Sequence, residues 1–313
     1  MSDFAASAMM RLVHMGLKRQ RISLESSRHE PVGIDARLPL ADKRSALVAL
    51  QSVHGIDCLL RIGEAVEDIS MNGEEAVHTA LLLANDPIDL LKRWQRLERF
   101  IHSHHRIAFT QIGPRELFVR HYSVDRKAAP LPAEDALVIG LLVLLLERVG
   151  AINLRARRVG SRTWLRADGR WRALSRSASA KSLAEWTIQW SGEQQQTRDA
   201  ITLTDETLIG KKLFLSIMRD PTKTWTLASA AAASLTSSRT IQRRLQNEGT
   251  SFQRILRESR VTLAAKLLAT GDAALAEIGY RSGFADQAHF QREFRIATAM
   301  TPREYREAFR SRP

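Results

Sequence analysis

The chain has 313 residues, about two domains' worth, and its 44% hydrophobic and 26% charged residues are typical of a soluble globular protein. Cys58 is its single cysteine, which excludes a disulfide framework and favours a reducing cytoplasm, and the longest apolar run, residues 136–146, is too short for a membrane span. The net charge of +13, from 47 Lys+Arg and 34 Asp+Glu, makes a polyanion the first partner to consider.

The N-terminal part mixes helical and strand patterns. Helical periodicity predicts helices over residues 3–18, 42–53, 72–84, 86–102 and 133–149, the fourth with Asp86 as N-cap and Pro87 in its first turn. Alternating or β-branched runs predict strands over residues 107–112, 116–122, 152–158, 163–166, 171–174 and 186–190, with turns at Gly113-Pro114 and Asp168-Gly169. We therefore expect an α+β domain over residues 1–200. A polar linker is expected over residues 191–205, overlapping the end of that domain.

No catalytic residue, metal site or cofactor is predicted in this part. His102, His104 and His105 lie close together, but histidines two residues apart do not share a helix face and no carboxylate lies at ligand spacing. Cys58 is expected to be a plain buried thiol. The apolar helix over residues 133–149 is interpreted as core, with an effector pocket and a dimer seam left open as alternatives.

From about residue 206 the pattern is entirely helical, and two segments have the same build. In the first, a short helix over residues 227–234 and a turn at Leu235-Thr236 precede a helix over residues 238–247 with Ser237 as N-cap. In the second, residues 274–282 and a turn at Gly283-Phe284 precede a helix over residues 287–296 with Asp286 as N-cap. Each segment matches a helix-turn-helix.

The second helix of each segment carries side chains suited to reading DNA bases. Helical spacing turns Ile241 and Leu245 inward on the first, and Phe290 and Phe294 inward on the second. The opposite faces carry Arg239, Gln242 and Arg243 on the first helix, and Gln287, Gln291 and Arg292 on the second. Arginine bonds bidentately to guanine and glutamine to adenine, so we expect these six residues to bind DNA in the major groove.

The two segments are joined by a helical pattern over residues 252–268, about 25 Å long. A rod of that length could hold two recognition helices in successive major grooves, roughly 34 Å apart. The chain closes with Thr301-Pro302-Arg303-Glu304, a capping box that opens a last helix to about residue 310.

Residues 225–310 resemble the double helix-turn-helix domain of the AraC/XylS family of bacterial transcription regulators. The resemblance is carried by Arg239-Thr-Ile-Gln-Arg-Arg-Leu245, Glu248-Gly-Thr-Ser-Phe252, Ala276-Glu-Ile-Gly-Tyr280, Gly283-Phe284, His289-Phe-Gln-Arg-Glu-Phe294 and Thr301-Pro-Arg-Glu-Tyr-Arg306. Leu235 stands where the first turn of the family usually has glycine, which costs roughly 1–2 kcal/mol if the backbone there is left-handed. Ala299 also replaces a familiar glycine, before Thr301-Pro302. Residues 1–200 resemble, in pattern only, the arabinose-binding-type N-terminal domain, which implies effector sensing and self-association but no particular ligand.

These observations predict an α+β sensor domain over residues 1–200 and an all-α double helix-turn-helix DNA-binding domain over residues 206–313. The predicted function is that of a cytoplasmic, non-enzymatic, effector-responsive transcription regulator. Its expected partners are double-stranded promoter DNA, RNA polymerase, a small-molecule effector and a second copy of the chain, with no membrane and no cofactor. Two alternatives stay open: an effector-independent regulator whose N-terminal domain only dimerises, and a DNA-tethered enzyme, against which the isolated Cys58 argues.

Overall fold

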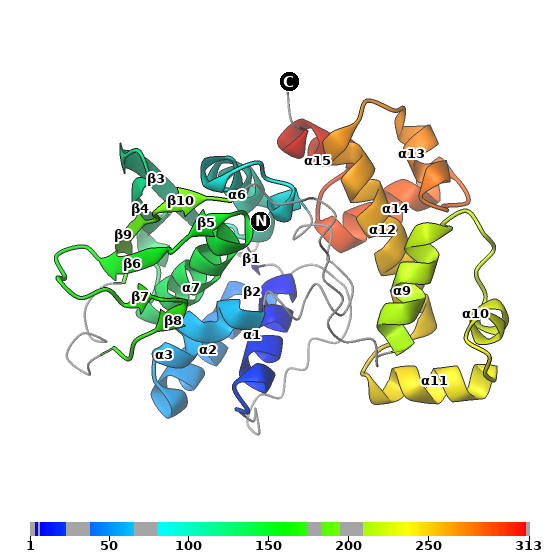
Figure 1. Ribbon diagram of the computed structural model, residues 1–313, viewed down its shortest axis with the longest axis horizontal. Helices are drawn as coiled ribbons and strands as arrows, with labels where there is room; N and C mark the ends of the chain where they lie inside the picture. The colour runs from blue at the N-terminus through cyan, green and yellow to red at the C-terminus, as the bar shows by residue number, and fades with distance from the viewer. Residues whose placement is uncertain are drawn as a thin grey trace. The chain divides into compact units, whose positions relative to one another are not determined.

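The computed structural model describes residues 4–5, 7–22, 38–65, 80–174, 183–194 and 209–310 (Figure 1). The chain divides into two compact units. The N-terminal unit comprises Met1–Val66 and Leu81–Thr197, and the C-terminal unit comprises Glu67–Ala80 and Arg198–Pro313. We describe each unit by itself.

A six-stranded antiparallel sheet organises the N-terminal unit (Figure 1). Its strands run in the order β3 (His105–Gly113), β4 (Glu116–Ser123), β9 (Glu185–Gln189), β6 (Arg155–Arg158), β7 (Arg166–Ala167) and β8 (Arg170–Trp171). Along β4 the side chains of Leu117, Val119 and His121 are buried and alternate with more exposed neighbours, as expected for a sheet with one face on a core.

Helix α7 (Pro132–Arg148) lies on the buried face of the sheet, and thirteen of its seventeen residues are buried. Asp135 and Glu147 of α7 pair with His121 of β4 and Arg166 of β7. On its other side α7 meets the chain between α3 (Asp57–Leu60) and η1 (Arg61–Ala65) so closely that a Cβ at Gly140 would lie 2.2 Å from the Leu60 carbonyl oxygen. The apolar run is therefore a core helix, as predicted.

The remaining elements of this unit include α1 (Ser7–Arg19), α2 (Leu40–His54), α6 (Pro87–Ile101) and the two-residue strands β1 (Phe4–Ala5), β2 (Leu38–Pro39), β5 (Ala151–Ile152) and β10 (Gly192–Glu193). The short 3-10 helix η2 (Arg126–Ala128) precedes α7. Asp86 caps α6 by accepting a hydrogen bond from the Asp89 backbone N–H at 2.7 Å, as predicted. Among the described residues no single helix has the length and apolarity to cross a bilayer, and only the bent pair Leu40–His54 and Asp57–Ala65 passes such a test when taken together.

The structure corrects several predicted strands. The strand predicted over residues 152–158 breaks at Asn153, whose φ of +52° cannot continue a strand, and β5 pairs instead with β10. Gly192 and Glu193 are therefore strand rather than linker. The strands predicted at 163–166 and 171–174 shrink to β7 and β8 around the Asp168-Gly169 turn, where both residues have positive φ. Of the helix predicted over residues 72–84, only residues 80–84 are described, and residues 80–82 are helical. Residues 72–79 and most of the linker lie outside the described residues.

The described part of the C-terminal unit is entirely helical. Its helices are α9 (Ile209–Arg219), α10 (Leu227–Ala233), α11 (Ser238–Asn247), α12 (Phe252–Thr270), α13 (Leu275–Arg281), α14 (Gln287–Thr298) and α15 (Pro302–Phe309). The first four share a core that includes Leu213, Trp225, Ile241 and Phe252. The last helices are joined by a chain of aromatic contacts through Phe284, Phe290, Phe294, Tyr305 and Phe309.

Candidate nucleic-acid interface and a buried polar cluster

The first helix-turn-helix consists of α10 and α11. The Thr226 and Ser229 side chains form a reciprocal capping box at the start of α10. The turn after α10 contains Leu235, which has a φ of +49° and is 96% exposed. Ser237 then starts α11 by accepting a hydrogen bond from the Thr240 backbone N–H at 3.1 Å. The predicted turn and N-cap are confirmed, and Leu235 is left-handed.

The exposed face of α11 carries the three side chains that the sequence predicts to read bases. Ile241 and Leu245 are 0% and 1% exposed, so they anchor the helix. Arg239, Gln242 and Arg243 are all exposed and lie on the opposite side at 3.6 residues per turn. The helix therefore presents three hydrogen-bonding side chains on one open face.

The second helix-turn-helix, α13 and α14, repeats this arrangement. Asp286 caps α14 by accepting a hydrogen bond from the His289 backbone N–H at 2.7 Å. Phe290 and Phe294 are fully buried. The predicted residues, Gln287, Gln291 and Arg292, are exposed.

Among the six predicted base-reading residues, only Arg292 has an ion pair within the described residues. Its Nε lies 3.6 Å from Glu293 Oε1, while the other carboxylate oxygen of Glu293 forms an ion pair with Arg257 Nε of α12 at 2.7 Å. Because the shorter contact engages Glu293 with α12, the Arg292 side chain stays 68% exposed. The Arg292 side chain thus lies near the Glu293 carboxylate but remains largely exposed to solvent.

Arg295 was not among the predicted residues. It is exposed on α14, three residues after Arg292 and four after Gln291, so it shares their face. The same periodicity that selected the other residues could have identified it.

Helix α12 joins the two segments. It has nineteen residues and is therefore about 28 Å long, and Ser251 caps its start by accepting from the Arg254 backbone N–H at 3.3 Å. Glu248, between α11 and α12, accepts hydrogen bonds from the backbone N–H groups of Ile209 and Gly210 at the start of α9, both at 2.9 Å. The first segment is therefore held on α9 and α12 together.

Residues 230–308 match the protein family described as Helix-turn-helix domain. The matched residues begin within α10 and run through α11, α12, α13 and α14 into α15. The curated relatives are named as regulators. This part of the chain is an AraC-type helix-turn-helix domain.

Two relatives illustrate the extent of the similarity. The urease operon transcriptional activator of Escherichia coli is 33% identical over 90 residues, 29% of this chain and 30% of that protein. The ornithine utilization regulator of Pseudomonas aeruginosa is 40% identical over 82 residues, 26% of this chain and 24% of that protein. The crystal structure of the transcriptional regulator CdpR from Pseudomonas aeruginosa covers 95% of this chain and 97% of that chain at 17% identity and a TM-score of 0.35. The matches thus span about a quarter to a third of the length of these two curated relatives.

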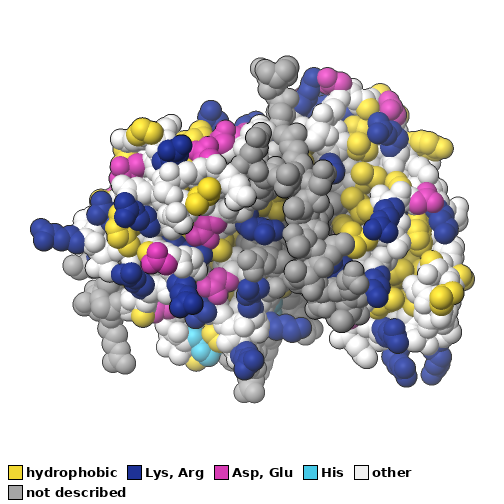
Figure 2. Space-filling view, in the orientation of Figure 1, with side chains coloured by type: hydrophobic (Ala, Val, Ile, Leu, Met, Phe, Trp, Pro, Cys, Tyr) yellow, Lys and Arg dark blue, Asp and Glu magenta, His cyan; other side chains and the backbone are white. Residues whose placement is uncertain are grey.

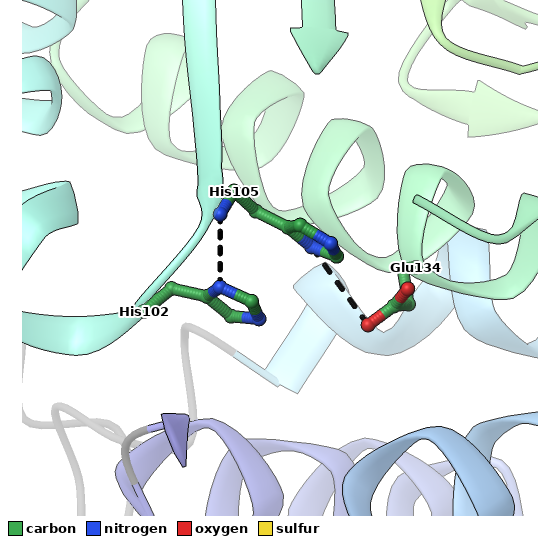
Figure 3. Close-up of side chains that lie close together, drawn as sticks. All are labelled: His102, His105 and Glu134. Carbon is green, nitrogen blue, oxygen red and sulfur yellow. Dashed lines mark hydrogen bonds and ion pairs between the residues drawn. The ribbon is translucent and has the colours of Figure 1, made fainter. Parts of the chain in front are cut away.

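Outside the AraC-type domain, the structure brings together a cluster that the sequence did not predict (Figure 3). His102, His105 and Glu134 are all buried and place one nitrogen or oxygen atom each within 4.8 Å of the others. His102 Nε2, His105 Nδ1 and Glu134 Oε1 make no hydrogen bond within the described residues, and the last two atoms lie 3.8 Å apart. Glu134 is 29 residues from His105 in the sequence, and only the packing of α7 against the start of β3 brings them together.

The hydrogen bonds of this cluster do not fit a metal ion. His102 Nδ1 accepts from the backbone N–H groups of His104 and His105, at 3.2 and 3.0 Å. A neutral imidazole with its lone pair on Nδ1 carries its proton on Nε2, so the inward nitrogen of His102 is a donor and not a ligand. The oxygen of Glu134 that a metal would need is already 3.2 Å from the Lys43 ammonium.

The charges around the cluster favour neutral histidines. Burial lowers the pKa of His102 strongly and that of His105 to about 3. Burial also lowers the pKa of Lys43; it would raise that of Glu134, but Lys43 and its other neighbours hold the Glu134 carboxyl below its usual value. The cluster is thus a buried ion pair next to uncharged imidazoles, beside a cavity of about 30 Å³.

A larger hollow of about 390 Å³ lies elsewhere in the N-terminal unit. Its lining includes the cationic side chains of Arg19, Arg21 and Arg61, together with His54 and Asp57. Cys58 also lines it, and burial raises the pKa of this thiol to about 11, so it is not an activated nucleophile. The volume is within the range of small-molecule sites.

Proposed function

We propose that the chain is a sequence-specific DNA-binding transcription regulator that acts in the cytoplasm, where it meets promoter DNA. The observation that carries the proposal is the pair of capped helices α11 and α14, each anchored by two buried apolar side chains and open on the opposite face. Arg239, Gln242, Arg243, Gln287, Gln291 and Arg292 are the residues that we propose to bind DNA in two neighbouring major grooves.

Genome-wide mapping of bound sites tests this function. It should yield a motif with two half-sites about one helical turn apart. The absence of any enriched motif in cells that express the full chain would contradict the proposal.

We propose further that the N-terminal unit binds a small anionic effector in the 390 Å³ hollow. Three arginines line it, and guanidinium groups bind carboxylates and phosphates bidentately. Such a ligand would shift the regulator between states that differ in their engagement of promoter DNA and RNA polymerase, because it binds one of them better. Self-association through this unit belongs to the same proposal.

A thermal-stability screen with anionic metabolites separates the sensor from a regulator whose N-terminal unit only dimerises. A ligand that binds the folded form raises the melting temperature, and Arg21→Gln should abolish the rise while Arg120→Gln, on the sheet, should not. If no anion stabilises the chain, the result favours an effector-independent regulator whose N-terminal unit only dimerises.

We infer no enzymatic activity. The relatives matched by the AraC-type domain are named as transcription regulators, and Cys58, the one thiol in the chain, has a raised pKa.

A further inference from the structure

The positive charge of the N-terminal part is concentrated in one short stretch. Residues 1–220 hold 32 Lys+Arg and 26 Asp+Glu. The 18 residues Arg155–Arg172 hold seven arginines, no lysine and a single acidic residue, Asp168. The other 202 residues carry 25 basic and 25 acidic side chains, so this stretch accounts for the whole surplus.

The strand register turns three of these arginines to the outer face of the sheet. Ala156 of β6 is fully buried and pairs with Arg166, which faces α7 and binds Glu147. Arg155 and Arg157 flank Ala156 and therefore point the other way. Arg170 pairs with Ala167, one position beyond Arg166, and so points outward as well. Figure 2 shows Lys and Arg side chains over β6 to β8 at the left of the view.

Two of these side chains, Arg155 and Arg157, are held in place by contacts that leave their charge uncompensated. The guanidinium groups of Arg155 and Arg157 lie 4.5 and 4.6 Å from the ring centroid of Trp164, an arrangement that holds them by cation–π attraction. Arg155 also donates to the Gln189 side chain, which is uncharged. Within the described residues, no carboxylate forms an ion pair with Arg155, Arg157, Arg170 or the nearby, exposed Arg172.

We propose that Arg155, Arg157, Arg170 and Arg172 form a second DNA-binding surface, the β6–β8 surface, which contacts backbone phosphates of double-stranded DNA. The inference rests on the proposed function, which supplies DNA as a partner. Arginine alone, rather than a mixture with lysine, suits phosphate because its planar fork bonds two oxygens at once. Stacking on Trp164 engages the faces of the two guanidinium groups and leaves their terminal N–H groups for such bonds, while Arg155 Nε donates to Gln189.

The test measures binding of the full chain to a random-sequence 40-bp duplex by fluorescence anisotropy between 50 and 300 mM salt. The variant replaces the four arginines by glutamine: Arg155→Gln, Arg157→Gln, Arg170→Gln and Arg172→Gln. Each phosphate contact contributes about −0.9 to the slope of log K against log salt, so the magnitude of this negative slope should fall by up to about 3.6. At 0.1 M salt each lost contact should weaken binding about eightfold.

A matched control removes the same charge elsewhere on the same unit. Arg99, Arg115, Arg120 and Arg126 are all exposed, and changing these four to glutamine should leave the slope near that of the wild type. A variant with lysine at the four β6–β8 positions should keep most of the slope because it keeps the charge. Circular dichroism of each variant checks that it is folded.

Equal slopes for the β6–β8 variant, the control variant and the wild type would overturn the inference while leaving the proposed function intact. Failure of the wild-type chain to bind any duplex would overturn both. A β6–β8 variant that binds DNA normally but no longer binds phosphatidylserine vesicles would assign the surface to lipid and refute the DNA proposal.

Discussion

Replacing Leu235 by glycine should stabilise the first helix-turn-helix. Leu235 has a φ of +49°, where an L-residue is about 1–2 kcal/mol less stable than glycine. Its side chain is 96% exposed, so its removal sacrifices almost no buried apolar area. Glycine also adds conformational freedom to the unfolded chain, which offsets about 0.4–1 kcal/mol. The net stabilisation should be about 0.5–1 kcal/mol.

Native-state hydrogen exchange measures this change where it occurs. Amides of α11 whose exchange requires opening of the segment should exchange roughly two to five times more slowly in Leu235→Gly. Leu235→Ala is the matched control: alanine keeps the Cβ and hence the strain, so exchange should not change. If exchange is slower in the alanine variant, or is not slowed in the glycine variant, the backbone at position 235 stores no strain.

The equivalent turn of the second segment should respond in the opposite direction. Gly283 has a φ of +81°, and a Cβ there would lie 2.1 Å from the Pro221 carbonyl oxygen. Gly283→Ala therefore adds a backbone clash to the left-handed penalty and should destabilise α13 and α14 by more than about 2 kcal/mol.

Three further predictions concern recognition, pH and metals. Arg243→Ala and Arg292→Ala should each cost about 1–3 kcal/mol of specific binding and relax preference at one base pair, and unchanged binding-site motifs would refute their roles. Burial raises the pKa of Glu98 to about 8; since the unfolded chain releases this proton near pH 4.5, the carboxyl lowers stability progressively between about pH 4.5 and 8. Glu98→Gln should therefore raise the melting temperature more at pH 8.5 than at pH 5, and an equal rise at both values would contradict the shift. Zinc chloride should not raise the melting temperature through His102 and Glu134, and a zinc-dependent rise that His102→Gln abolishes would show that the inward nitrogen can lose its proton.

The C-terminal elements could be predicted because their signals are local. Ser237, Asp286 and Thr301 each cap the helix that follows them, and each cap is visible within four residues of sequence. The left-handed turn positions are likewise set by the end of the preceding helix. The sequence therefore places these helices to within a few residues.

The N-terminal unit was predicted less completely because its pairings are long-range. β9 lies between β4 and β6 in the sheet although 26 residues, 159–184, separate β6 from β9 in the chain. The lengths of β7 and β8 depend on that pairing and not on their own composition. Spacing rules for metal ligands also could not relate Glu134 to His105, because the relation is made by tertiary packing.

Arg257 and Arg292 compete for one carboxylate, and this has a consequence for how recognition can change. Arg257 lies on the connecting helix and outside the proposed base-reading set, yet it holds Glu293 at 2.7 Å. If Arg257 were lost, Glu293 would be free to draw Arg292 into a full ion pair and away from a base. We therefore expect a change at Arg257, outside the proposed base-reading set, to alter base preference through the choice of partner made by Glu293.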